Sequence, residues 1–196
     1  MRVRIAKQLA ARLLVLSLLC LTIPQAFANT TESSPELRKL LQEAIESDSG
    51  FEDRFAAEVW LVDMSTRLKR FVKSPETRII MLKQIHYESS RVNVAPELVL
   101  ALIEVESAFN EFAISVAGAR GLMQVMPFWL DEIGLSDKNL FKIRTNLRMG
   151  CTILRYYLDI ESGNLTRALA RYNGSLGRNT YPNKVIHALN TRWFRQ

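Results

Sequence analysis

The chain has 196 residues, of which 48% are hydrophobic, so it is long and apolar enough to form one domain with a core. Its 26 basic and 20 acidic residues give a formal net charge of +6, which suits a polyanionic partner. Two cysteines exclude a disulfide framework, and His86 and His187 lie too far apart for a metal site of the usual spacing. We therefore expect no metal and no other cofactor.

The first 28 residues have the pattern of a secretory signal peptide. A basic start precedes an apolar run from Leu13 to Ile23, too short to span a bilayer, and then the cleavage-type sequence AFA at 26–28. We expect cleavage after Ala28, export, and no stable membrane span once the signal is removed. Cys20 leaves with the signal, and the apolar surroundings of Cys151 predict a buried small hydrophobic residue.

Charge divides the rest of the chain unevenly. Residues 29–63 contain three basic and nine acidic residues, whereas residues 64–196 contain 19 basic and 11 acidic ones. The basic part suits an anionic polymer, but export and the absence of a recognition motif argue against nucleic acid. We expect an N-terminal helical segment at 29–74 and a main domain at 75–196.

Helical periodicity predicts three helices before the middle of the chain. The first two cover 36–45 and about 51–72. The second is expected to bury four residues, namely Phe55, Val59, Val62 and Leu68. Ser74 and Pro75 then form a typical helix start, and this third helix should end near Ser89, with Glu88 at the surface.

The helix that begins at Pro96 carries a carboxylate on its apolar face. Leu98, Leu102 and Glu106 are spaced by four residues and share one face, whereas Glu104 should point into solvent. A carboxylate among apolar side chains acquires a raised pKa and stays protonated near neutral pH, as a general acid must. By spacing alone, a structural Glu, satisfied by backbone N–H groups or half exposed at the helix end, fits better than a catalytic one.

Beyond Phe109 the pattern predicts a glycine-containing loop and then further helices. They are expected at 122–126, at 128–133, from Thr145 or Asn146 to Leu158, at 165–172 after a start at Asn164, and from Pro182 to Trp193. No repeat and no convincing alternating strand pattern is present, so the fold class is all-α, with a short strand or hairpin left open.

Residues 106–127 resemble the catalytic core of the soluble lytic transglycosylases, which are relatives of goose-type lysozyme. The family pattern is E-S-x-F and then A-x-S-x-x-G-A-x-G-L-M-Q-x-M-P, and this chain has ESAF at 106–109 and AISVAGARGLMQVMP at 113–127. Residues 146–158 resemble its N-x-x-x-G…Y-L segment. Residues 168–174 resemble its A-L-A-x-Y-N motif, although Ser175 replaces the usual Gly. The resemblance covers about 96–181 and implies a lysozyme-like helical domain at 75–196.

The resemblance implies non-hydrolytic cleavage of the MurNAc–GlcNAc β-1,4 bond of peptidoglycan, which leaves a 1,6-anhydroMurNAc end. Glycosidases usually need two carboxylates, but no second one is apparent here. The sugar's own acetamido group would replace it. Glu106 would first protonate the leaving oxygen and then deprotonate the C6 hydroxyl.

Five further positions are implied to bind substrate: Ser115, Gln124, Met126, Tyr172 and Asn173. Ser115 would lie near the catalytic Glu and Gln124 at the floor of the cleft, while the Tyr172 hydroxyl would reach Glu106 or the sugar acetamido group. From the residues alone, Ser115 is equally a loop-capping hydroxyl, Gln124 a helix-surface amide and Tyr172 a half-buried aromatic.

Three other functions remain open at this point. A hydrolytic muramidase would share the fold and the Glu, and a non-catalytic module would bind glycan strands without turnover. A scaffold protein of a wall-spanning assembly would dock a cell-envelope partner through residues 29–74. The family resemblance implies the periplasm as the location.

Overall fold

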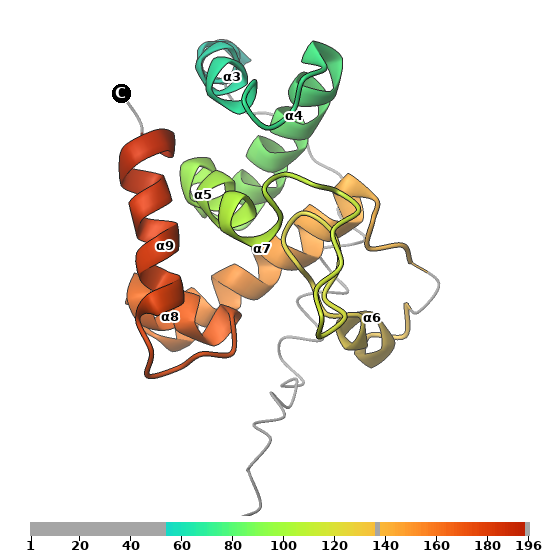
Figure 1. Ribbon diagram of the computed structural model, residues 1–196, viewed down its shortest axis with the longest axis vertical. Coiled ribbons are helices and arrows are strands. Elements are labelled where there is room, and N and C mark those ends of the chain that lie inside the picture. The colour runs from blue at the N-terminus through green and yellow to red at the C-terminus, as the bar shows by residue number, and fades with distance from the viewer. Residues whose placement is uncertain (1–53, 136–137, 195–196) are drawn as a thin grey trace, which may run out of the picture. The chain divides into compact units, whose positions relative to one another are not determined.

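The computed structural model describes residues 54–135 and 138–194 (Figure 1). Within these ranges the chain forms seven α-helices and a short π-helix. They are α3 (Arg54–Leu68), α4 (Pro75–Arg91), α5 (Pro96–Ser107), α6 (Phe128–Glu132), α7 (Ile143–Ile160), α8 (Leu165–Tyr172), α9 (Thr180–Ala188) and η1 (Leu189–Trp193). The described residues contain no strand, so the predicted all-α class is confirmed. The expected signal peptide, its cleavage site and the helix at 36–45 lie outside the described residues.

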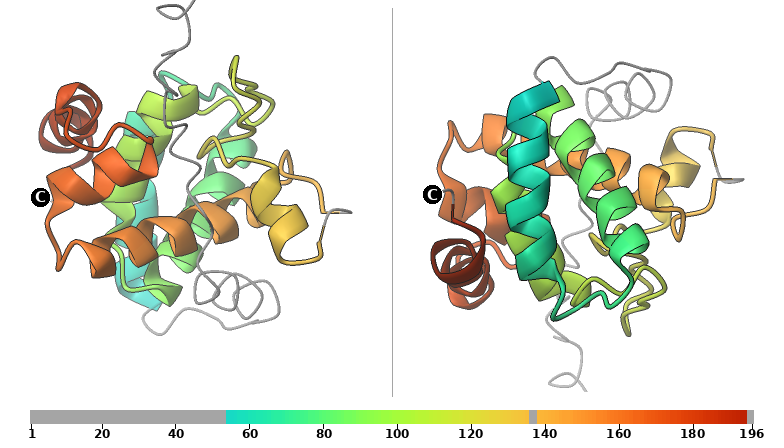
Figure 2. Two further views of the ribbon diagram at one scale, coloured as in Figure 1. Left: turned by 90° about the horizontal axis from the view of Figure 1, so that it is seen from below. Right: turned by 90° about the horizontal axis from the view of Figure 1, so that it is seen from above.

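Helix α5 forms the centre of the core. Every residue from Glu97 to Ile103 is buried, and the helix packs against α4, α9 and η1. Helix α3 lies beside α4, and α7 packs against α4 and α8 (Figure 2). Burial of apolar surface on all sides of α5 fixes its position, and with it the side chains of its last turn. None of the described helices has the length and apolar character needed to cross a bilayer.

Local cap signals fixed several helix starts as expected. The Ser74 hydroxyl accepts a hydrogen bond from the Thr77 N–H at 3.2 Å, and Pro75 opens α4. Asn164 caps α8 in the same way, through the Arg167 N–H at 3.1 Å. Each cap satisfies a backbone donor that has no partner within its helix.

Helix α3 buries a different stripe from the one that its sequence indicated. Val59 and Val62 are 60% and 72% exposed, whereas Leu61, Met64 and Leu68 are buried. Both stripes have helical spacing, and packing against α4 selects the second. Only Leu68 was assigned correctly, and the side chain of Phe55 lies outside the described set.

The expected helix at 122–126 is absent, and this segment forms turns. Arg120 and Val125 exchange two backbone hydrogen bonds, of 2.9 and 3.0 Å, and Arg120 also pairs with Ile114. Gln124 has a left-handed backbone with φ of 49°, which interrupts any helix there. For this segment, the short hairpin that the sequence left open fits the structure better than the expected helix.

Helix α7 begins at Ile143 after Lys142, not at the expected caps Thr145 or Asn146. Asn146 lies inside the first turns and its side chain binds a neighbouring loop. Glu88, expected at the surface, is fully buried and pairs with Arg148 of α7 and with Arg91, each at 2.9 Å. A partner 60 residues away neutralises it, which local spacing does not reveal.

Candidate active site

Glu106 lies in the last turn of α5, where the chain bends sharply into the following loop. Ala108 and Phe109 both adopt left-handed backbone angles, with φ of 49° and 64°. The buried Phe109 ring packs against Phe71 and Trp193, with centroid distances of 5.1 and 5.5 Å. This aromatic cluster ends the helix and holds Glu106 at its edge.

The Glu106 carboxylate has one hydrogen-bond donor among the described residues. The Tyr181 hydroxyl, from α9, donates to its Oε1 at 2.6 Å, and no arginine or lysine of the described ranges pairs with it. Burial raises the pKa of Glu106 from 4.5 to about 7, although the bond from Tyr181 acts in the opposite direction. Glu106 therefore has the inward position and the raised pKa that its spacing predicted, while its role in catalysis stays a prediction.

Tyr172 does not donate to Glu106. Its hydroxyl donates to the backbone carbonyl of Met123 at 2.8 Å and so connects α8 to the loop that follows Glu106. The pKa of Tyr172 lies well above its usual value. Burial is the largest cause, and the Glu106 charge is the next largest. Among the described residues, the hydroxyl that binds Glu106 is that of Tyr181, nine residues later, which sequence reasoning missed because no motif marks it. The contact of Tyr172 with the sugar acetamido group stays a prediction.

Ser115 and Gln124 both fix the loop that follows Glu106. The Ser115 hydroxyl accepts a hydrogen bond from the Ala119 N–H at 3.0 Å and so caps the loop, while its contact with substrate stays a prediction. The Gln124 amide nitrogen donates to the carbonyls of Ala113 and Gly121, at 3.2 and 2.9 Å. Within the described residues its amide oxygen accepts no hydrogen bond. Gln124 is therefore not the helix-surface amide that the sequence alone suggested, because no helix forms at 122–126.

Met126 and Asn173 complete the predicted set. Met126 is half-buried and packs against the core, as most apolar residues at such spacing do. Asn173 is exposed and forms the C-terminal cap position of α8. Their contact with substrate stays a prediction.

Asn146 anchors the loop from the α7 side, a role that sequence reasoning did not assign. Its amide nitrogen donates to the carbonyls of Arg120 and Leu140, at 2.8 and 2.9 Å, and its amide oxygen accepts from the Met123 N–H at 2.7 Å. A Cβ on Gly121 would lie 2.4 Å from that side chain. Only glycine therefore fits at position 121, where the loop contacts the Asn146 side chain of α7.

Gly150 makes the second close approach between α7 and the loop. A Cβ at this position would lie 2.5 Å from the Met123 sulfur. On the α5 side, the Ser107 hydroxyl donates to the Leu122 carbonyl at 2.8 Å. The loop is thus bound to α5, α7 and α8 and forms a rigid neighbour of Glu106.

Two other residues of the sequence analysis have clear outcomes. Cys151 is fully buried, and burial raises the pKa of its thiol, which agrees with the expected small hydrophobic residue. Glu104, expected in solvent, has a side chain that is only 13% exposed and pairs with Arg192. That expectation was wrong because the C-terminal residues cover it.

Comparison with known proteins gives the following relatives. Residues 83–190 match the family described as "Transglycosylase SLT domain". A "Transglycosylase" from Enterobacteria phage PRD1 is 32% identical over 109 residues, which covers 52% of this chain and 40% of the relative.

Two cellular relatives are named "Membrane-bound lytic murein transglycosylase C". The one from Yersinia pestis is 28% identical over 131 residues, which is 56% of this chain and 37% of the relative. The one from Actinobacillus pleuropneumoniae is 54% identical over 39 residues, which is 20% and 11%. The chain spans less than half the length of these curated relatives.

Proposed function

The chain belongs to the transglycosylase SLT domain family, and we propose on this basis that it is a lytic transglycosylase acting on peptidoglycan. The observation that supports the proposal most strongly is Glu106, a mostly buried carboxyl group with a pKa of about 7 and no countercharge in the described residues. With this pKa, about half of the molecules carry the proton at pH 7 and can donate it, which is what glycosidic cleavage requires.

The proposed reaction uses Glu106 in two steps. The protonated carboxyl group donates its proton to the glycosidic oxygen while the bond from that oxygen to the MurNAc anomeric carbon breaks. The acetamido oxygen of the same sugar bonds to the anomeric carbon in its place. The Glu106 carboxylate then accepts the proton of the C6 hydroxyl, whose oxygen attacks the anomeric carbon and displaces the acetamido oxygen. Glu106 is protonated again, and no water is consumed.

The state of the other carboxylates supports a mechanism with one acid. Glu104 is bound by Arg192 and Trp193, and Glu88 is bound by two arginines inside the core. Neither is available as a nucleophile or base, which supports a reaction in which the substrate supplies the second group. Tyr181 fixes one oxygen of Glu106 and thereby its orientation.

Product analysis tests this proposal. Purified peptidoglycan is digested by the mature protein, by Glu106→Gln and by Glu76→Gln, an exposed carboxylate at the start of α4 that serves as control. We expect 1,6-anhydro-muropeptides from the wild type and the control and none from Glu106→Gln. Reducing ends would instead make the protein a hydrolytic muramidase. Glycan binding without products from any variant would favour the binding or scaffold function.

We also propose that the protein is exported to the periplasm and that its signal is cleaved after Ala28. The basic start, short apolar run and AFA sequence support this. A cell-envelope partner is proposed for the acidic N-terminal segment 29–74, of which residues 29–53 precede α3 and can be deleted without removing that helix from α4 and η1. N-terminal sequencing of the protein from cell fractions tests the first proposal, and affinity capture with residues 29–53 deleted tests the second.

A further inference from the structure

The two carboxylates at the end of α5 are both bound by the C-terminal helix. Glu106 and Glu104 are two residues apart and so face different sides of α5. Tyr181, near the start of α9, binds Glu106, while Arg192 and Trp193, at the end of η1, bind Glu104. The rod that α9 and η1 form together is therefore attached to α5 near both ends of the rod. One of the two α5 residues that it binds, Glu106, is the proposed catalytic group.

The attachment at Glu104 is dense. The Arg192 Nε and the Trp193 indole N–H donate to the same oxygen, Oε2, at 2.7 and 2.8 Å. A second Arg192 nitrogen binds Oε1. The Trp193 side chain is completely buried and stacks on Phe71 at a centroid distance of 6.3 Å. A bidentate, largely desolvated pair of this kind fixes direction as well as distance.

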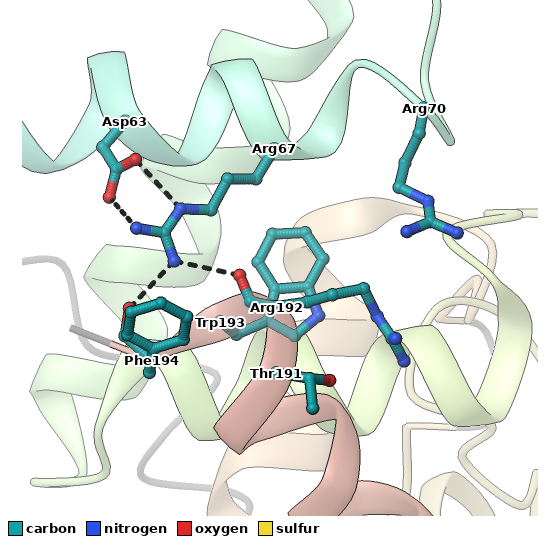
Figure 3. A pocket seen from close by; sticks show the side chains of 7 residues that line it. All are labelled: Asp63, Arg67, Arg70, Thr191, Arg192, Trp193 and Phe194. Atoms are coloured by element: carbon teal, nitrogen blue, oxygen red, sulfur yellow. Dashed lines mark hydrogen bonds and ion pairs between the residues drawn. The ribbon is translucent and has the colours of Figure 1, made fainter. Parts of the chain in front are cut away.

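Arg67 of α3 holds the same segment from the other side, at a hollow between α3 and η1 (Figure 3). One of its nitrogens donates to the carbonyls of Arg192 and Phe194, both at 2.9 Å. The rest of its guanidinium binds Asp63, at 2.9 and 2.6 Å. The donors of Arg67 thus bind groups of the protein itself. One of the two carbonyls that Arg67 binds belongs to Arg192, the residue whose side chain binds Glu104.

We refer to Arg67, Arg192, Trp193 and Glu104 as the C-terminal clamp. Three of these four residues, and Asp63, lie outside the stretch 83–190 that matches the family. The clamp therefore adds contacts from both flanks to the common core. Only its carboxylate, Glu104, comes from inside that core.

We propose that the C-terminal clamp positions Tyr181 against Glu106, so that Glu104 acts as a positioning residue for the proposed reaction. The catalytic part of this inference rests on the proposed function, whereas the structural part does not. Release of η1 from Glu104 would let the rod move, and a displacement of about 1 Å at a catalytic group can cost up to about 100-fold in rate.

Two variants test the clamp from its two sides. Glu104→Gln keeps the size of the side chain but removes the charge that Arg192 binds, and Arg192→Gln removes the cation. The matched control is Glu97→Gln on the same helix. Glu97 is also buried and also accepts a hydrogen bond from an indole, that of Trp60 at 3.0 Å, but it does not bind η1. Melting temperatures establish that each variant is folded.

The first measurement needs no substrate. The ¹³Cζ resonance of Tyr181, assigned by its loss in Tyr181→Phe, reports the hydrogen bond to Glu106. We expect this resonance to move toward that of free tyrosine in both clamp variants and to stay in place in Glu97→Gln. An unchanged resonance in the two clamp variants would overturn the proposal, whether or not the protein is a transglycosylase.

The second measurement is a double-mutant cycle on turnover. We expect Glu104→Gln to lower kcat about tenfold, with KM changed less than about twofold, in the wild-type background. In the Tyr181→Phe background the same change should cost less than about twofold, because the residue through which it acts is already removed. Two effects that multiply independently would contradict a role through Tyr181. If the wild type makes no anhydro product, the proposed function fails and the resonance alone decides the clamp.

Among the described residues, two tyrosines are the titratable groups that interact with Glu106. Tyr181 of α9 binds it, Tyr172 of α8 is affected by its charge, and the charges of Glu104 and Arg192 lie on the other side of α5. Both tyrosines have pKa values well above 10, since burial and the Glu106 charge raise them. The titration of Glu106 near pH 7 is therefore separated from that of these two tyrosines.

Discussion

Glu88 on α4 is fully buried and Glu106 on α5 is half-buried, and their surroundings differ completely. Glu88 is fully buried, and each of two guanidinium groups, from Arg91 and Arg148, lies 2.9 Å from it. Glu106 has the Tyr181 hydroxyl and no cation among the described residues. The more deeply buried carboxylate is thus the compensated one. Countercharge, more than burial, separates a structural ion pair from a carboxyl group whose pKa rises to about 7.

The largest expected effect is the loss of activity in Glu106→Gln. We expect the rate of product formation to fall on the order of 10²–10⁴-fold, because the amide cannot donate or accept the required proton. Thermal stability should not fall, since no cation loses a partner. Muropeptide release and a melting curve measure both. A variant that keeps more than about a tenth of the wild-type rate would remove Glu106 from the mechanism.

Glu88→Gln should produce the opposite result. Two arginines would lose a buried countercharge, which we expect to cost about 3–5 kcal/mol in the free energy of unfolding. The pH dependence of activity of the folded protein should be unchanged. Urea unfolding measures the loss. Asp159→Asn, which breaks an exposed pair with Arg155, is the control and should cost less than about 1 kcal/mol. Equal losses in the two variants would refute the comparison.

The pH dependence of stability should also reveal the raised pKa of Glu106. The pKa of Glu106 is higher in the folded protein, about 7, than the 4.5 expected when unfolded. Between these values the folded state binds more protons, so stability falls as pH rises from 4.5 to 7 and then levels off. After allowance for its solvent-facing side, the loss should be about 1–3 kcal/mol. Glu106→Gln should lack this slope, and a wild type without it would contradict the raised pKa.

Tyr181→Phe should change the pH profile rather than abolish activity. The hydroxyl lowers the pKa of Glu106, so its removal should move that pKa above 7 and shift the alkaline limb of kcat to higher pH. Loss of orientation should reduce kcat about tenfold. Tyr172→Phe is the control, because the Tyr172 hydroxyl binds Met123. The alkaline limb of its pH profile should stay at the wild-type pH. Identical profiles for the two variants would argue against the special role of Tyr181.

Ser115→Ala should have the smallest effect. The hydroxyl caps a loop through the Ala119 N–H, so its loss should cost about 1 kcal/mol in stability. KM for peptidoglycan should stay within about twofold of the wild-type value. A large rise in KM, with stability unchanged, would instead indicate that Ser115 binds substrate.

The sequence predicted those features that depend on neighbours along the chain. Ser74 and Asn164 are caps because their side chains bind N–H groups three residues later. The inward direction of Glu106 follows from helical spacing with Leu98 and Leu102. Such features need no knowledge of which segments pack together.

The failures concern contacts between distant segments. Tyr181 and Glu106 are 75 residues apart, and Arg192 and Glu104 are 88 apart. A charged residue beyond the apolar stripe looks solvated until the chain that covers it is known, which explains the error at Glu104. On α3, two apolar stripes had equal spacing, and only packing against α4 chose between them.

The most direct test of this account is the pKa of Glu106 itself. The ¹³Cδ resonance of the Glu106 carboxyl group is followed by NMR from pH 3 to 9 and assigned by its absence in Glu106→Gln. The account predicts a midpoint near 7, against 4.5 for an ordinary Glu. A midpoint near 4.5 would mean that Glu106 is charged at neutral pH and is not the proton donor.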